Sequence, residues 1–151
     1  MTGSSAGRLA CISETMNLSR VALITAASGF TGFGVACLVR PQRMLNRVDI
    51  RPKSARGTTE LRAMYGGLEL GLGAFFAAAA AKSEWSRPAL LAQTLGLGAL
   101  ASSRLAGILR DHPRGALMKV LLAAESATAV LGAVALTAAR PKQAETALPA
   151  A

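Results

Sequence analysis

Four charged side chains lie inside long apolar stretches of the sequence, where they could bind a ligand or transfer a proton. They are Arg62, Glu69, Arg104 and Glu125, and Lys119 lies closer to the end of its stretch. If these stretches cross a bilayer, each ionised group costs at least ~2.5 kcal/mol and therefore needs a partner. Two arginines and two glutamates at matching depth can neutralise one another. The arginines could instead hold an anionic group, while the glutamates orient them or carry a proton.

Further polar and small residues share a face with two of these charges. At 3.6 residues per turn, Arg62, Tyr65, Gly66, Glu69 and Gly73 project within about 100° of arc. A polar stripe on an apolar helix must face the inside of a bundle rather than lipid. The cluster that we expect there, called the charge cluster below, consists of Arg62, Tyr65, Glu69, Arg104 and Glu125.

The glycines of the same stretch are expected to let helix backbones approach closely. Gly67 and Gly71 are spaced as a small-xxx-small pair, and Gly66 and Gly73 belong to the polar stripe. This spacing is typical of packed membrane helices. The sequence contains no phosphate-binding loop motif that would give these glycines another role.

The elements that must position the charge cluster are four long apolar runs. They cover residues 21–39, 61–81, 89–109 and 116–139, and charged residues or prolines bound each of them. A run of about 20 residues is long enough to cross the hydrocarbon of a bilayer, and the prolines mark helix ends. With 52% hydrophobic residues in a chain of 151, the sequence predicts an all-α integral membrane bundle of four transmembrane helices.

The chain is expected to form one transmembrane domain over residues 20–140. Residues 1–19 are predicted to be a disordered extension, residues 141–151 a disordered tail, and Met16 is an alternative start. The first run is not expected to be a cleaved signal peptide, because it is long and follows twenty other residues.

The distribution of basic residues indicates a membrane orientation rather than a nucleic-acid partner. The formal net charge is +9, but aromatic residues make up only 4% of the chain, too few for stacking on bases. Eight cations lie in the connections 40–60 and 110–115, against six at the other ends of the helices. The positive-inside rule then places the 40–60 connection in the cytoplasm and both termini outside it.

Neither a metal nor another cofactor is expected. The sequence has two cysteines, Cys11 and Cys37, and a single histidine, His112, without the paired spacing of a zinc site.

The segment from Glu60 to Gly73, with the pattern E-L-R-A-x-Y-G-G-x-E-x-G, resembles the signature of a family of small bacterial four-helix membrane proteins. The family is known only as a domain of unknown function. The resemblance extends to Arg104 and Glu125 and covers roughly residues 20–140. It implies the fold and the importance of Arg62, Tyr65, Gly66, Gly67 and Glu69, but no activity. We expect the protein to lie in a bacterial inner membrane.

Two interpretations of the charge cluster remain open. In the first, the cluster binds a small amphipathic ligand or the anionic head group of a lipid, with membrane lipid as the surrounding partner. In the second, the ion pairs only fix helix packing, and the protein is a non-catalytic structural or partner-docking subunit. A homo-oligomer is compatible with both, and the sequence does not decide whether the protein is an enzyme.

Overall fold

The computed structural model describes residues 3–139, with side chains from Glu14 onward except that of Thr15. The described residues form helices and no strand, which confirms the all-α prediction. In chain order, the elements are α1 (Gly3–Val39), α2 (Pro41–Leu45), the 3₁₀ helix η1 (Asn46–Val48), α3 (Ala55–Arg62), the π-helical turn η2 (Ala63–Gly67), α4 (Leu68–Ala81), α5 (Ser83–Asp111) and α6 (Leu117–Ala138).

Three segments are long and apolar enough to cross a membrane. They are Met16–Val39, Ala55–Ala81 and Leu117–Ala138, which indicates a multi-pass membrane protein. The fourth predicted span lies in α5, which has 29 residues but is not among the three. Its polar residues, above all Gln93 and Arg104, lower its hydrophobicity, so a transmembrane position for α5 remains a prediction.

The first helix differs from the expectation at its start. α1 begins at Gly3 and includes most of the segment 1–19 that was predicted to be disordered. The first proline of the chain is Pro41, so nothing between Gly3 and Val39 breaks the helical hydrogen bonds. The expectation for residues 141–151 lies outside the described residues.

The turn between α4 and α5 corrects a second expectation. The apolar run 89–109 predicts a helix that starts after Pro88, but α5 begins at Ser83 and Pro88 lies inside it. Lys82 alone separates the two helices, with an extended backbone that ends α4. Trp85 lies in the first turn of α5. The ammonium nitrogen of Lys82 lies over its indole ring, 4.8 Å from the ring centroid. The chain therefore reverses within one residue, and the helix starts before the proline.

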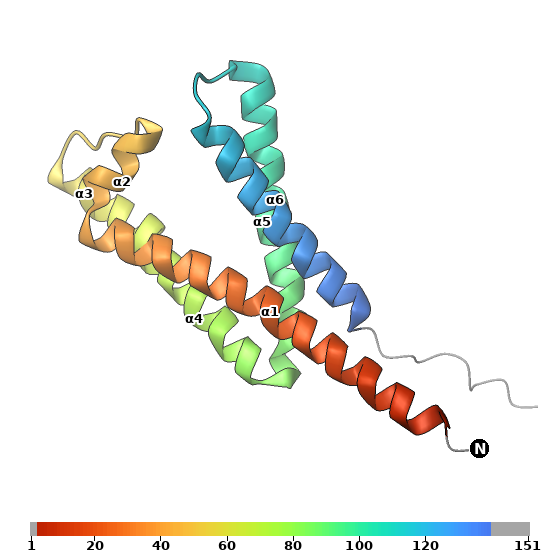
Figure 1. Ribbon diagram of the computed structural model, residues 1–151. Coiled ribbons are helices and arrows are strands. Elements are labelled where there is room, and N and C mark those ends of the chain that lie inside the picture. The colour runs from red at the N-terminus through yellow and green to blue at the C-terminus, as the bar shows by residue number, and fades with distance from the viewer. Residues whose placement is uncertain (1–2, 140–151) are drawn as a thin grey trace, which may run out of the picture.

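The long helices form two antiparallel pairs that diverge. α1 packs mainly along α4, and α5 packs along α6. Figure 1 shows the two pairs close together near the α4–α5 turn and spread apart toward the end that carries α2 and α3. We call these the α4–α5 end and the α2–α3 end. The first turn of α1 and the last turn of α6 lie toward the α4–α5 end (Figure 1).

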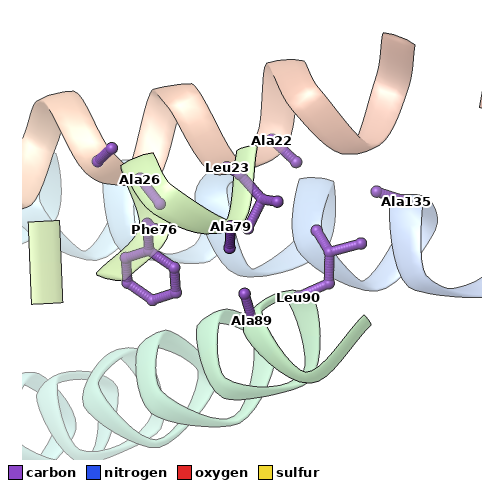
Figure 2. Packing of buried hydrophobic residues seen from close by; sticks show 9 residues of the cluster. Ala22, Leu23, Ala26, Phe76, Ala79, Ala89, Leu90 and Ala135 are labelled. Atoms are coloured by element: carbon purple, nitrogen blue, oxygen red, sulfur yellow. The ribbon is translucent and has the colours of Figure 1, made fainter. Parts of the chain in front are cut away.

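The apolar core lies at the α4–α5 end, where all four long helices meet. It is built largely of alanine, with a few larger side chains (Figure 2), namely Ala22, Leu23, Ala26, Ala27, Phe76, Ala79, Ala89, Leu90 and Ala135. Small side chains let helix backbones approach closely. Between helices in a bilayer, where burial releases no water, such close van der Waals packing is a main source of stability. This core therefore holds the two helix pairs together at one end and leaves the other end open.

Glycines set the close approach of α1 and α4. A Cβ atom on Gly34 would lie 3.0 Å from the carbonyl oxygen of Gly66, and one on Gly73 would lie 3.0 Å from the backbone nitrogen of Thr31. Gly67 and Gly71, also predicted to serve helix packing, face open space within this chain. Their different role follows from rotation of about 100° per residue, which places them on another face of the helix.

Candidate functional site

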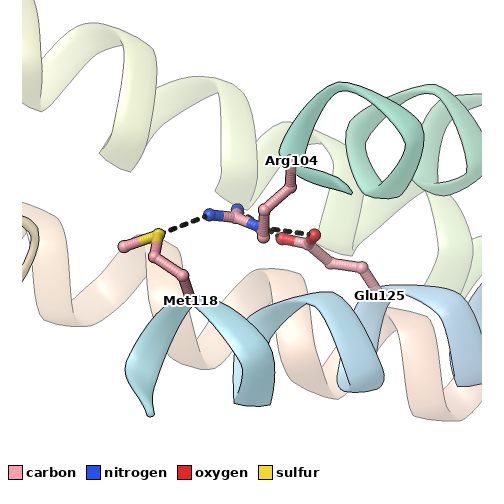
Figure 3. A network of polar contacts seen from close by, with 3 residues as sticks. All are labelled: Arg104, Met118 and Glu125. Carbon is pink, nitrogen blue, oxygen red and sulfur yellow. Dashed lines mark hydrogen bonds and ion pairs between the residues drawn. The ribbon is translucent and has the colours of Figure 1, made fainter. Parts of the chain in front are cut away.

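Arg104 and Glu125 form an ion pair with two hydrogen bonds between α5 and α6 (Figure 3). Arg104 donates from Nε to one carboxylate oxygen of Glu125 at 2.7 Å and from Nη2 to the other at 2.6 Å. Its Nη1 donates to the sulfur of Met118 at 3.5 Å. The two charged side chains are only 21% and 12% exposed. Such a two-pronged pair combines strong hydrogen bonds with a fixed geometry.

The α5–α6 hairpin explains why these two residues meet. α5 ends at Asp111, His112 adopts a left-handed conformation with φ 45°, and α6 begins at Leu117. Arg104 and Glu125 lie about two turns from these respective ends, so an antiparallel hairpin brings them to the same level. The sequence-based expectation of matching depth thus holds for this pair.

Glu69 has no such partner. It lies in the first turn of α4 and is half-buried, and no hydrogen bond or ion pair involves it among the described side chains. Tyr65, one turn earlier in the π-helical turn, lies with its ring nearly perpendicular to that of Phe33, with centroids 6.5 Å apart. Its hydroxyl likewise has no hydrogen-bond partner within the described part of the chain.

A central cavity of about 580 Å³ brings four of the five cluster residues together. It opens between the two helix pairs toward the α2–α3 end, and most of its lining is apolar, including Phe30, Phe33, Leu97, Leu100 and Leu121. The polar side chains on its wall are Thr25, Tyr65, Glu69, Arg104, Glu125 and Thr128. A cavity of this size with a few convergent polar groups is typical of small-molecule sites.

Arg62 does not take part. It is the last residue of α3, it is exposed, and it does not line the cavity. The expectation that Arg62 would pair within the cluster assumed a regular α-helix from Arg62 to Glu69. The π-helical turn over Ala63–Gly67 adds residues to one turn, which rotates Arg62 away from the face that Glu69 occupies.

The connection between α1 and α3 forms one wall of the central cavity, which the sequence analysis does not predict. Met44, Leu45, Val48 and Ile50 line the cavity, and Leu45 is only 2% exposed. In the sequence they belong to the basic connection 40–60, from which no site residue is expected. The signal that could have revealed them is the recurrence of apolar residues one to three positions apart within that basic stretch.

A second, more polar hollow of about 410 Å³ lies beside the central cavity at the α2–α3 end. Its charged residues include Arg47, Asp49, Asp111 and Arg114. Arg104, with Val48 and Met118, lines both spaces. The ion pair therefore lies at the boundary between an apolar interior and a polar outer region.

No group of three or more His, Cys, Asp or Glu side chains in the described residues is placed to hold a metal ion. Cys37 is a buried free thiol, and the side chain of Cys11 lies outside the described ones.

Comparison with curated proteins and with solved structures finds no match. Residues 18–136 match a protein family described as "Domain of unknown function (DUF4345)". The match covers most of the chain, including all residues of the charge cluster. The chain therefore belongs to the DUF4345 family, whose function is unknown.

Proposed function

We propose that this protein is a multi-pass membrane protein that binds a small amphipathic ligand in the central cavity. The observation that carries the proposal is the division of the cavity into an apolar wall and a small set of polar side chains. The apolar part of the ligand lies between Phe30, Leu97 and Leu100. Its polar head lies between Glu69 and Tyr65 on one side and the Arg104–Glu125 pair on the other.

Membrane placement supports this function. The candidate spans have many outward apolar side chains, such as Ile24, Leu68 and Val130, which suit contact with lipid tails. The cavity lies between the two helix pairs, so in a bilayer it would be surrounded by the lipid phase from which an amphipathic molecule would arrive. An anionic lipid head group, the narrower expectation from the sequence, is one member of the proposed ligand class.

A structural role is the alternative, and one observation favours it. The Arg104–Glu125 pair joins two helices that are already neighbours, as a clasp would. This role would suit a non-catalytic or partner-docking subunit. It does not explain why Glu69 has no partner or why the helices enclose a cavity. The binding function accounts for all three features.

Substitutions of two α1 glycines test the proposal with a matched control. Gly29 lines the cavity, whereas Gly32 does not, and a Cβ on either would meet nothing within 4 Å. Gly29→Phe should fill the cavity and lower ligand binding by about tenfold or more, while Gly32→Phe should leave it unchanged. Both variants replace a glycine of α1 with phenylalanine, so the change in helix propensity is the same in the two proteins and cannot explain a difference between them.

The measurement is native mass spectrometry of the protein in detergent, titrated with tetradecanol, tetradecylamine and tetradecanoate. Wild-type protein and Gly32→Phe should carry at least one of these probes, and Gly29→Phe should not. Equal adducts on wild-type and Gly29→Phe protein, or no adduct on wild-type protein, would show that the cavity is not a ligand site.

The proposed orientation places α5 across the membrane, the 40–60 connection in the cytoplasm and the α4–α5 turn outside, in a bacterial inner membrane. It can be tested with single cysteines in a variant whose Cys11 and Cys37 are replaced by alanine. A membrane-impermeant maleimide should label Glu84→Cys in intact cells, and Lys53→Cys and Arg114→Cys only after permeabilisation. Labelling of Lys53→Cys from outside would reverse the orientation, and equal access to Glu84→Cys and Arg114→Cys would exclude a crossing by α5.

A further inference from the structure

We infer that the head group bound in the central cavity is a hydrogen-bond donor, a hydroxyl or an ammonium, and that the carboxyl group of Glu69 accepts its hydrogen bond. The inference rests on the proposed binding function and adds the chemical class of the head group. It follows from which charges in the cavity are already satisfied.

The positive charge available for an anion is small. Arg104 already gives two hydrogen bonds to Glu125 and a third contact to Met118, so the pair has no net charge. Arg62, the second arginine that could have held an anion, lies outside the cavity. An anionic head would therefore have to displace Glu125 from a two-pronged ion pair.

Glu69 presents the opposite situation. Its side chain lines the cavity and has no hydrogen bond or ion pair among the described residues. A half-buried carboxyl group in a largely apolar space is stabilised when a ligand supplies the missing donor. The same group repels an anion, so the local charge favours a neutral or cationic head.

The packing around Glu69 holds it toward the cavity. A Cβ on Gly34 would lie 3.1 Å from the Cβ of Glu69, so α1 backs the stem of the side chain closely. Tyr65, one turn away on the same wall, has a hydroxyl that can both donate and accept, and its ring packs perpendicular to that of Phe33. Glu69 and Tyr65 together can bind one head-group oxygen or nitrogen.

The polar hollow gives the ligand a direction. Arg104 and Met118 line both the hollow and the cavity, so the polar end of the cavity is the one next to the hollow. A head group at Glu69 and Arg104 then lies toward the α2–α3 end, and the tail extends toward Phe30 and Leu97.

Three probes of equal chain length separate the possible head groups. Tetradecanol, tetradecylamine and tetradecanoate are titrated into wild-type protein and three variants at pH 7, with binding followed by native mass spectrometry. Wild-type protein should bind the alcohol and the amine about tenfold or more tightly than the carboxylate. Glu60→Gln is the matched control, because Glu60 is an exposed carboxylate of α3 that does not line the cavity, and it should behave as wild type.

The two changes at Glu69 should have different effects. Glu69→Leu removes the acceptor and should abolish the preference for the alcohol and the amine. Glu69→Gln keeps a neutral acceptor, so alcohol binding should persist while amine binding weakens. Thermal unfolding in detergent shows that each variant is folded.

The possible failures are distinguishable. Equal binding of all three probes to wild-type protein, a preference for the carboxylate, or a preference that survives Glu69→Leu would overturn the head-group inference and leave the proposed binding function standing. No binding of any probe to wild-type protein would overturn both.

Discussion

Replacing Glu125 with glutamine is expected to lower the free energy of unfolding by about 3 kcal/mol, the lower end for a broken buried ion pair. The change leaves the guanidinium of Arg104, held now at 2.6 and 2.7 Å by two carboxylate oxygens, without its counter-charge. Arginine does not lose its proton in proteins, so the stranded charge persists. The lower end applies because both side chains keep some exposure, 21% and 12%. Chemical or thermal unfolding in detergent measures the effect.

Replacing the arginine of the pair is expected to lower the free energy of unfolding by less than replacing the glutamate. Arg104→Gln strands a carboxylate, which can take up a proton and become neutral. The double variant, in which two amides face each other, should recover much of the loss, and the cycle gives the coupling energy directly. Glu69→Gln, which removes no ion pair, should leave stability nearly unchanged and serves as the control. If Glu125→Gln unfolds at the same point as the wild type, the ion pair does not stabilise the helix pair α5–α6.

The class of the fold follows from the sequence because its cause is local. Long apolar runs next to Arg40, Lys82 and Pro113 give helices long enough for a membrane, and α1 and α4 end at Val39 and Ala81. Belonging to a family of unknown function also follows from the sequence. The start of α1 at Gly3 does not, because a polar segment without proline carries no signal for where its helix begins.

The site was predictable only where the helix is regular. Arg104 and Glu125 meet because both lie in uninterrupted α-helices on either side of a short turn. Arg62 and Glu69 are separated by a π-helical turn, and a face assignment at 3.6 residues per turn fails across such an insertion. The residues Ala63–Gly67 contain no sequence pattern that predicts the π-helical turn.

The cavity itself depends on the angle between the helix pairs, which no single segment encodes. Alanines such as Ala79 and Ala89 draw the pairs together at one end, while larger side chains such as Phe33 and Leu100 line the space between them at the other. Apolar residues of the basic connection, Leu45 and Val48, then cover one side of the cavity. Only the assembled structure brings these three features together.

Substituting Gly73 with valine is expected to lower the free energy of unfolding by about 1–3 kcal/mol or more, through overpacking between α1 and α4. A Cβ at Gly73 would clash with the hydroxyl of Thr31 and lie 3.0 Å from the backbone nitrogen of Thr31 and 3.3 Å from the carbonyl oxygen of Ala27. A hydroxyl can rotate away, but backbone atoms move only if α1 moves as a whole. The separation of α1 and α4 must then increase, at a cost in packing over both helices.

Gly71→Val is the matched control for this prediction. It makes the same change in the same helix, where a Cβ would meet nothing within 4 Å, so it carries the same change in helix propensity without the clash. Adding Thr31→Ala to Gly73→Val should restore only part of the stability, because it removes the hydroxyl and leaves the backbone contacts. Unfolding in detergent compares the four proteins, and equal stability of the two valine variants would mean that Gly73 does not set the spacing of α1 and α4.

Since Gly34 and Gly66 lie at the same contact, a wider spacing would also displace Glu69, and Gly73→Val should then weaken probe binding in the cavity while Gly71→Val does not.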